Sequence, residues 1–487
     1  MLINLNKNSF DTEVDLPLSK SESNRALMIA FYRDIELCNS KTLECCDSVT
    51  KDFSNLETWR LGDSVTSLSN SDDTVLLENL LNKINQYIKN FGQSPLSVDY
   101  CPLTLDCANA GTVFRFLMTA VSFFQLTINN LQLTVDGDDS QQLSNSATQQ
   151  LNILLTGSDR MKQRPIDSLV DALRSLGVSI EYKEKEGYPP ILIRGNTPAP
   201  VPAPVPVPAP NSRPHIVEIS TEKSSQFASS LLLAAPLLES GLELHLTGNI
   251  SSLPYIDMTI KMMRQCGVDV VRNEKDITVK PGIYNIDNIA IEPDWSAAAF
   301  WYELVALSDD SKVLLKNLNI DSLQADAVAA KMFENLGVET ISVKEGIAIK
   351  KSTSNFQLST FNFKSCPDLF PAVIAACAGL RLNSTFSGLK NLSIKESDRK
   401  KAMMNELRKI NISFEEISDD ELKMFCPEEL PYFTEENPII FNNYDDHRIA
   451  MALSILSMKI GAISMENTEV VSKSYPDFYR SAQCVRD

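Results

Sequence analysis

Six nearly uniform apolar stretches recur along the chain, and each opens on polar or charged residues. They read SNRALMIAFY, AGTVFRFLMTAVSFF, SSQFASSLLLAAPLL, DWSAAAFWYELVAL, DLFPAVIAACAGL and HRIAMALSILSM. A helix that is apolar over most of its surface is buried inside a domain. The sequence therefore predicts six core helices, which start near Lys20, Asn109, Ser224, Asp294, Asp368 and His447.

A second kind of helix separates the apolar ones. Segments such as LVDALRSLGVSIEY, IKMMRQCGVDVV, AAKMFENLGVETIS and MNELRKINISFEEI are amphipathic and run into a β-rich hairpin. Gly177, Gly267, Gly337 and Asn411 stand where a left-handed helix C-cap is expected. The repeating unit is therefore a buried helix, a strand, an amphipathic helix and a hairpin, and it occurs six times.

The first two units are longer than the others and predict two inserts. One is a polar, acidic stretch near 34–100, which includes SLSNSDDT. The other, near 196–214, contains TPAPVPAPVPVPAP, and alternating Pro predicts an extended polyproline-like surface segment. Its place between two strand signals favours a spacer over a docking peptide for an SH3-type partner.

A chain of 487 residues is too long for one ordinary core. The sixth unit lacks its hairpin, whereas a spare β-like segment, MLINLNKNSFDTEVDLPL, precedes the first unit. We infer that the N-terminal strands complete unit six. The prediction is an α/β (α+β) protein with one three-unit domain over 18–291 and a second made of 1–17 plus 292–487, joined by crossings near residues 16 to 18 and near Ile291.

Composition restricts the partners of the protein. A formal charge of −18 argues against nucleic acid, because phosphate backbones require a basic face. The apolar run FASSLLLAAPLL is too short to span a bilayer, and the start of the chain does not look like a secretory signal. The ten cysteines follow no zinc-binding spacing and are expected to be reduced thiols, so no metal is expected. We expect a cytoplasmic monomer without nucleic-acid or membrane partners.

Candidate functional residues concentrate where the apolar helices begin. Ser, Asn and Asp are ordinary N-caps, and capping alone explains Ser224 or Asp294. It does not explain Lys20, Arg25 or Arg448, because a cation near a helix N-terminus opposes the dipole. Free N–H groups and cations that converge on one cleft would bind an anion. The residues at these starts are Lys20, Ser21, Arg25, Asn109, Gly111, Thr112, Arg115, Ser224, Ser225, Gln226, Glu292, Asp294, Asp368, His447 and Arg448.

Three further loops carry charged residues that could join this cleft. They are RMKQRPIDSL with Arg160, Lys162 and Arg164, IKESDRKK with Lys395, Glu396, Asp398 and Arg399, and SKSYPDFY with Lys473. A charge run such as KESDRKK is usually a solvated helix face. We favour the functional interpretation because the run would add to the other groups.

The motifs LPLSKSESNRALMIA, NAGTVFRFL, RMKQRPIDSLVDAL, SSQFASSLLLAAP, IKESDRKKAM, YDDHRIAMALSI and KSYPDFY occur in the order typical of the 5-enolpyruvylshikimate-3-phosphate (EPSP) synthase family. The resemblance covers nearly the whole chain apart from the inserts. It implies two domains of three βαβαββ units each, closing over the substrates. It also implies transfer of the enolpyruvyl group of phosphoenolpyruvate to the 5-hydroxyl of shikimate 3-phosphate, with release of phosphate through a tetrahedral intermediate and with no metal or organic cofactor.

The resemblance also assigns roles to residues. Asp368 would be the base at the hydroxyl, while Lys20 and Glu396 would handle the proton at the methylene carbon. Shikimate 3-phosphate would be held by Lys20, Ser21, Arg25, Ser224, Ser225, Gln226, Ser252, Tyr255, Asp368, Asn391 and Lys395. Phosphoenolpyruvate would be held by Lys20, Asn109, Gly111, Thr112, Arg115, Arg164, Gln226, Arg399, His447, Arg448 and Lys473.

Two positions depart from the family pattern. Phe116 stands where relatives usually have Pro, so sensitivity to glyphosate, which Gly111 favours, is left open in degree. Asp445 makes the motif YDDHR in place of the commoner YNDHR, and Asp445 and Asp446 are both expected to cap the helix that starts at His447. Two rival functions are UDP-N-acetylglucosamine enolpyruvyl transferase and a non-catalytic sensor of a phosphorylated metabolite. The first carries a reactive Cys in a loop whose counterpart here, RMKQRPIDSL, has none.

Overall fold

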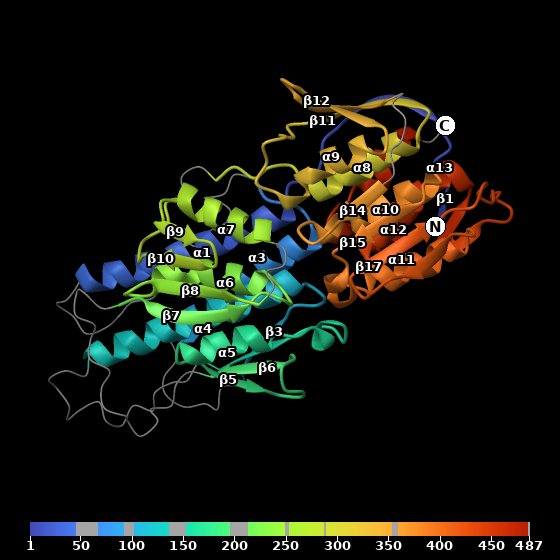
Figure 1. Ribbon diagram of the computed structural model, residues 1–487. Coiled ribbons are helices and arrows are strands. Elements are labelled where there is room, and N and C mark those ends of the chain that lie inside the picture. The colour runs from blue at the N-terminus through green and yellow to red at the C-terminus, as the bar shows by residue number, and fades with distance from the viewer. Residues whose placement is uncertain are drawn as a thin grey trace.

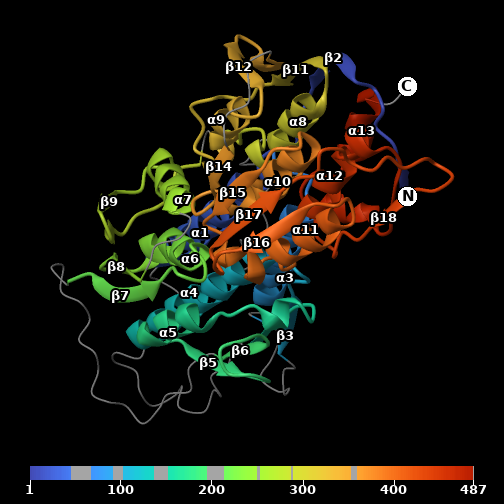
Figure 2. The ribbon, with the colours of Figure 1, turned by 45° about the vertical axis from the view of Figure 1, so that its right-hand side comes forward.

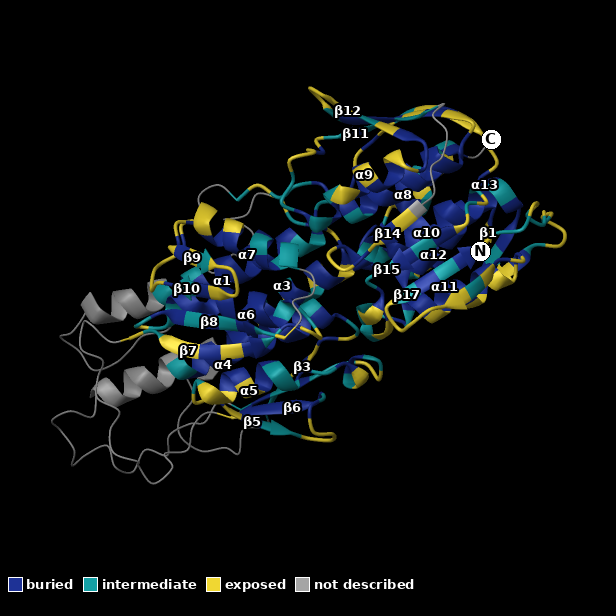
Figure 3. Cartoon of the chain, viewed as in Figure 1, coloured by how far each residue is buried: buried dark blue, intermediate teal, exposed yellow. Residues whose placement is uncertain are grey.

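The computed structural model describes residues 1–44, 67–91, 102–135, 152–194, 213–248, 253–286, 289–352 and 359–485. Figure 1 shows two halves that lie side by side, and the N-terminus lies in the same half as the C-terminus. The buried apolar side chains form two clusters. One is drawn from 26–286, and the other joins residues of 3–16 to residues of 295–485. Figure 3 shows buried helices inside each half.

Two four-stranded sheets belong to the first half. Each sheet belongs to one unit, in which a buried helix and an amphipathic helix alternate with the strands. The last two strands of each unit form an antiparallel hairpin. Unit two of the chain contains β3 (Leu103–Asp106), α4 (Gly111–Val135), β4 (Asn152–Thr156), α5 (Asp167–Ser175), β5 (Ser179–Tyr182) and β6 (Ile191–Arg194). Unit three contains β7 (His215–Ser220), α6 (Gln226–Ala234), β8 (Leu242–Thr247), α7 (Leu253–Gln265), β9 (Val270–Asn273) and β10 (Asp276–Val279).

The second half repeats the pattern with three sheets, which Figure 2 shows above and to the right of the first half. They have the strand orders β12-β13-β11-β2, β14-β15-β17-β16 and β1-β19-β18. The elements are β1 (Leu2–Ile3), β2 (Ser9–Val14), α8 (Trp295–Leu307), β11 (Asp310–Lys316), α9 (Ala329–Glu334), β12 (Val338–Val343), β13 (Gly346–Lys351), β14 (Ser359–Asn362), α10 (Phe370–Gly379), β15 (Ser384–Ser387), α11 (Arg399–Arg408), β16 (Ser413–Glu416), β17 (Glu421–Phe425), β18 (Ile439–Phe441), α12 (His447–Ile455), α13 (Ser457–Ile460), β19 (Ile463–Met465) and α14 (Phe478–Ser481).

The N-terminal strands were predicted to complete unit six, and this is only half correct. β1 pairs antiparallel with β19 of that unit. β2 instead pairs in parallel with β11 of unit four, from Ser9 opposite Asp310 to Val14 opposite Leu315. In each four-stranded sheet, the strand that follows the buried helix pairs in parallel with one neighbour. In the sheet of unit four, β11 follows α8 and β2 is that parallel neighbour. The N-terminal segment therefore joins two units of the second half.

The first unit differs from the expected pattern in its described part. It consists of α1 (Lys20–Glu44) and α3 (Asp72–Phe91), and no strand is assigned to it in 20–44 or 67–91. The stretch near 34–100 is therefore not simply an insert, because α3 is the amphipathic helix of this unit. Leu77, Leu81 and Ile84 of α3 are buried in the core of the first half. Most of the Pro-rich stretch lies outside the described residues.

The helices begin and end close to the predicted positions. α1, α4, α6, α8 and α12 start within two residues of the predicted positions, and a 3₁₀ turn over Pro367–Leu369 leads into α10. Gly177, Gly267, Gly337 and Asn411 have φ of +92°, +82°, +78° and +64°, as expected for left-handed C-caps.

Two segments cross between the halves side by side. The N–H of Ser19 donates to Glu292 O at 2.8 Å, and the N–H of Asp294 donates to Pro17 O at 2.8 Å. Beside them lies the buried carboxyl of Glu22, which accepts from the N–H of Glu292 at 2.9 Å. Burial and the nearby Glu292 raise the pKa of Glu22 to about 8. The crossing is thus a short, hydrogen-bonded pair of segments from which α1 and α8 both start.

Candidate active site

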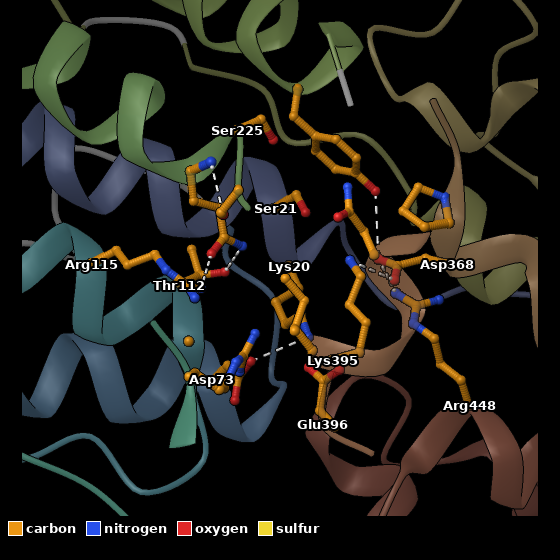
Figure 4. A pocket seen from close by; sticks show the side chains of 18 of the residues that line it. Lys20, Ser21, Asp73, Thr112, Arg115, Ser225, Asp368, Lys395, Glu396 and Arg448 are labelled. Carbon is orange, nitrogen blue, oxygen red and sulfur yellow. Dashed lines mark hydrogen bonds and ion pairs between the residues drawn. The ribbon is translucent and has the colours of Figure 1, made fainter. Parts of the chain in front are cut away.

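A pocket lies between the two halves, where the starts of the buried helices meet (Figure 4). It encloses about 990 Å³ of space, counting the part open to solvent. Its wall contains Lys20, Ser21, Arg25, Asp73, Gly111, Thr112, Arg115, Arg164, Lys223, Ser224, Ser225, Gln226, Tyr255, Asp294, Pro367, Asp368, Asn391, Ile394, Lys395, Glu396, Arg399, His447 and Arg448.

Arg399, the first residue of α11, organises the wall formed by the second half. Its side chain is 1% exposed, and each guanidinium nitrogen reaches a carboxylate. Nη1 donates to Asp368 Oδ1 at 2.6 Å, Nη2 to Glu396 Oε2 at 2.9 Å and Nε to Asp446 Oδ2 at 2.8 Å. Charge-assisted bonds of this kind fix both partners in place. Arg399, predicted to hold an anionic ligand, therefore also holds three carboxylates.

Asp368 lies at the centre of a ring of cations. Besides Arg399, Arg448 Nη2 donates to Asp368 Oδ2 at 3.2 Å, and Lys395 Nζ lies 3.4 Å from Oδ1. The hydroxyl of Tyr255 approaches Oδ2 from the first half at 3.5 Å. Burial acts to raise the pKa of Asp368, but the three cations outweigh it and hold the pKa well below the usual carboxyl range. The carboxylate is thus ionised.

Glu396 is held ionised by the same kind of surroundings. Burial acts to raise its pKa, but Arg399, Lys473 and other nearby cations hold the pKa well below the usual range. Lys473 Nζ lies 3.9 Å from Glu396 Oε1. At neutral pH this side chain is therefore a proton acceptor and not a proton donor.

The wall formed by the first half presents two arginines from different elements. Arg115 Nη1 donates to Gln226 Oε1 at 2.6 Å, and Gln226 Nε2 donates to Thr112 Oγ1 at 2.6 Å. Arg115 Nε and both Nε and Nη1 of Arg164 are buried without a hydrogen-bond partner among the described residues. Burial and the charge of Arg164 lower the pKa of Arg115 well below its usual value. Unpaired guanidinium donors beside a pocket are what an anionic ligand would satisfy.

Arg25 forms a third part of the wall and is almost fully enclosed. It donates to Thr259 Oγ1 and Ser21 O at 2.8 Å each and to Tyr255 O at 3.2 Å. Phe116, the residue that departs from the family pattern, is buried and lies under Arg25, with the guanidinium carbon 5.7 Å from the ring centroid. Burial lowers the pKa of Arg25 to about 10, so the group remains a cation at neutral pH.

Lys20 has a partner that the sequence analysis missed. Its Nζ lies 3.2 Å from Asp73 Oδ2, on the first turn of α3. Asp73 belongs to the sequence SDDT, which was assigned to a polar, acidic insert. The apolar spacing of Leu77, Leu81 and Ile84 was the signal that could have placed a helix there. Asp294 was foreseen as a cap and does cap α8, but it also lines the pocket and accepts from the N–H of Lys20.

Asn109 and Lys473, assigned to phosphoenolpyruvate, do not belong to the pocket wall formed by the described residues, and neither do the candidates Glu292, Arg160, Lys162 and Asp398. Lys473 Nζ donates to Asn109 O at 2.9 Å, so these two lie next to the wall without forming it. Ser252 lies outside the described residues. His447 does line the pocket, and neither ring nitrogen has a hydrogen-bond partner in the described part of the chain. Burial and the nearby Lys20 and Arg448 lower the pKa of His447 well below its usual value, so the imidazole is neutral.

The two aspartates before α12 were both expected to be caps, and only one is. Asp446 is the N-cap, and its Oδ1 accepts from the N–H of Arg448 at 3.0 Å. Asp445 has φ of +54°, is exposed and accepts from Asn467 Nδ2. The expectation that Asp445 caps the helix is therefore wrong, because Asp446 occupies the N-cap position and the Asp445 carboxylate accepts from Asn467 instead.

Comparisons with known proteins agree with this geometry. A family model described as EPSP synthase (3-phosphoshikimate 1-carboxyvinyltransferase) matches residues 6–481. A 3-phosphoshikimate 1-carboxyvinyltransferase of Bacteroides fragilis is 31% identical over 476 residues, covering 96% of this chain and 93% of that protein. One of Sulfurovum sp. is 29% identical over 486 residues, covering 97% and 96%.

Solved structures show the same fold. EPSP synthase of Acinetobacter baumannii matches with a TM-score of 0.63 at 19% identity, covering 99% of this chain and 97% of that chain. The enolpyruvyl transferase NikO of Streptomyces tendae matches with a TM-score of 0.58 at 11% identity, covering 99% and 96%. The α/β (α+β) enolpyruvyl transferase fold that the resemblance implies is thereby confirmed. Among the described residues, no helix is long and apolar enough to cross a membrane.

Proposed function

The chain belongs to the EPSP synthase (3-phosphoshikimate 1-carboxyvinyltransferase) family and transfers an enolpyruvyl group from phosphoenolpyruvate to shikimate 3-phosphate, and we propose that the pocket between its halves is where this happens. The observation that carries the proposal is that cations from both halves line one pocket, which also holds the ionised Asp368. Both substrates are small polyanions, and a locally cationic pocket attracts them even though the whole protein is acidic.

We assign the two substrates to two groups of residues, each of which includes residues of both halves. Arg25, Ser21, Ser224, Ser225, Tyr255, Asn391 and Lys395 would hold shikimate 3-phosphate, and Ser252 stays a prediction. Arg164, Arg115, Arg399, Arg448 and Lys473 would hold phosphoenolpyruvate, together with Asn109, Gly111, Thr112 and His447. Lys20 and Gln226 would contact both. The unpaired guanidinium donors of Arg115 and Arg164 support the second group, because a carboxylate and a phosphate accept from planar forks.

The charges of the site suggest how the protons move. Asp368, ionised among cations, would take the proton of the attacking 5-hydroxyl as its oxygen bonds to the enol carbon. The methylene carbon needs a proton in this addition and loses one when phosphate leaves. Glu396 is held ionised and suits the second step as acceptor. We therefore propose Lys20 as the donor of the addition step, a choice that the sequence left open.

The remaining expectations are part of the proposal. We propose one substrate-binding domain over 18–291 and another over 1–17 plus 292–487, since the buried residues cluster along this division. We propose that the enzyme works as a monomer in the cytoplasm.

Phosphate release tests the function directly. We expect release with phosphoenolpyruvate and shikimate 3-phosphate and none with phosphoenolpyruvate and UDP-N-acetylglucosamine. Release only with the nucleotide sugar would move the protein to the rival enolpyruvyl transferases. Tight binding of shikimate 3-phosphate without turnover would support the sensor.

Replacing Gly111 by alanine should raise KM for phosphoenolpyruvate. A Cβ at this position would lie 2.5 Å from Arg164 Nη1 and 2.7 Å from Arg115 Nη1, so both guanidinium groups must move. Overpacking typically costs about 1–3 kcal/mol. We expect KM to rise roughly tenfold, since about 1.4 kcal/mol corresponds to a factor of ten. Steady-state kinetics with varied phosphoenolpyruvate measures this.

Gly282→Ala is the matched control, because a Cβ there meets nothing within 4 Å. It should leave both KM values unchanged. An unchanged KM for phosphoenolpyruvate in Gly111→Ala would remove Gly111 from this subsite.

A further inference from the structure

Arg160 lies in the first half of the molecule, yet its guanidinium contacts the second half. The residue stands between β4 and the 3₁₀ turn Met161–Gln163. Nη2 donates to Ser393 O at 3.0 Å and to Lys395 O at 2.9 Å. Nε donates to Lys395 O at 3.2 Å and to Glu396 O at 3.1 Å. One side chain thus satisfies three backbone carbonyls more than 230 residues away in the sequence.

These carbonyls need partners from outside their own segment. They lie at the end of the 3₁₀ helix Lys390–Ile394 and in the two residues after it. The last carbonyls of a helix have no partner within it and form the negative end of its dipole. A guanidinium suits them because its donors form a rigid planar fork, whereas the ammonium of a lysine is a single point charge. The contact therefore fixes the direction of this backbone as well as its position.

The backbone held by Arg160 carries two site residues. The side chain of Lys395 ends 3.4 Å from Asp368 Oδ1, and Glu396 Oε2 lies 2.9 Å from Arg399 Nη2. Figure 4 shows both beside Lys20 at the middle of the pocket. Arg160 itself does not belong to the pocket wall. Arg160 can therefore act on the chemistry in two ways: through the backbone of 393–396, and through its positive charge, which adds to burial in lowering the pKa of Arg164. Arg160→Lys, which keeps the charge, separates the two.

We propose that Arg160 is a positioning residue for the reaction, a role that rests on the proposed function. Because its donors and acceptors belong to different halves, the contact exists only while the halves are together. It then sets Lys395 and Glu396 against the reacting atoms. The reaction geometry is thus completed by a residue that touches neither substrate.

The test compares three variants of the full chain. Arg160→Ala removes the fork, Arg160→Lys keeps the charge without the fork, and Lys162→Ala removes a cation from the same turn. Lys162 is the matched control because its only described ion pair, with Glu184 at 2.9 Å, stays within the first half and is exposed. Phosphate release gives kcat and both KM values, and hydrogen exchange reports on the amides of 390–398.

We expect Arg160→Ala to lower kcat by roughly tenfold to a hundredfold, since a displacement of about 1 Å can cost a factor of 10². KM for phosphoenolpyruvate should change much less. Exchange in 390–398 should become faster, and Arg160→Lys should recover only part of both effects. Lys162→Ala should match the wild type.

Two results would overturn the proposal. They are wild-type kcat in Arg160→Ala, even with a lowered melting temperature, and full recovery in Arg160→Lys. If the wild type releases no phosphate with shikimate 3-phosphate, the proposed function fails by itself. Exchange then still decides whether Arg160 holds the backbone of 393–396, because unchanged exchange in Arg160→Ala would show that it does not.

Discussion

Replacing Asp368 by asparagine is expected to lower kcat by about 10²–10⁴-fold, the usual contribution of a general base. The amide keeps the shape of the side chain but cannot take the proton of the attacking hydroxyl. Substrate binding should persist, because the change removes a negative charge from between Arg399, Arg448 and Lys395 and leaves the pocket more cationic. Phosphate release for kcat and calorimetric titration with shikimate 3-phosphate for binding measure the two effects separately.

Asp445→Asn is the matched control for this prediction. The substitution is the same, it lies three residues before Arg448, and Asp445 is exposed and outside the pocket wall. Asparagine also tolerates the left-handed conformation found there. This variant should keep wild-type kcat. If Asp368→Asn lost its affinity for shikimate 3-phosphate while turnover at saturation stayed normal, Asp368 would be a ligand and not the base.

The order of elements and the residues at the helix starts could be predicted because both depend on local pattern. Runs such as HRIAMALSILSM are apolar on all faces wherever they are placed, so their burial follows from composition. The cations at their starts stood out because they oppose the helix dipole. The repetition also predicted that the helix starts meet in one pocket, because equivalent helices of a repeat point the same way.

Pairings between distant segments could not be predicted in this way. Arg399 and Asp446 are 47 residues apart, and neither motif specifies the other as partner. The same holds for Arg160 and the carbonyls of 393–396. β2 had two sheets open to it, and alternation within Ser9–Val14 does not choose between them. Asp73 was hidden because acidic residues in a polar stretch are usually solvated, and only the burial of α3 brings it to Lys20.

Replacing Arg399 by methionine is expected to destabilise the protein by about 3–5 kcal/mol, the usual cost of removing one partner from a buried ion pair. The variant leaves the carboxylates of Asp368, Glu396 and Asp446 without the guanidinium that contacts all three. Activity should also fall strongly, because Asp368 and Glu396 lose their common anchor. Thermal unfolding followed by circular dichroism gives the apparent melting temperature. Arg399→Lys, which keeps the charge, should lose less.

The loss of stability in Arg399→Met should depend on pH with a defined sign. In the wild type the pKa values of Asp368 and Glu396 are held well below the usual range. Their stabilising contribution is therefore complete above the unfolded value, roughly pH 4, and is lost only as the pH falls further through the folded values. Without Arg399, burial of these carboxylates is opposed only by their remaining cations, such as Arg448 and Lys395 at Asp368, so their pKa values rise towards the unfolded values.

The difference between wild type and Arg399→Met should therefore be complete near pH 7 and smaller near pH 3, where the carboxylates of the variant take up protons before those of the wild type. Lys401→Met is the matched control, since Lys401 lies on the same helix, is exposed and pairs only weakly with Asp398 at 3.4 Å. An exposed pair of this kind contributes about 0–1 kcal/mol, so this variant should unfold close to the wild-type temperature. A penalty in Arg399→Met that is equally large at pH 3 and pH 7 would mean that lost packing, and not the lost ion pairs, causes the instability.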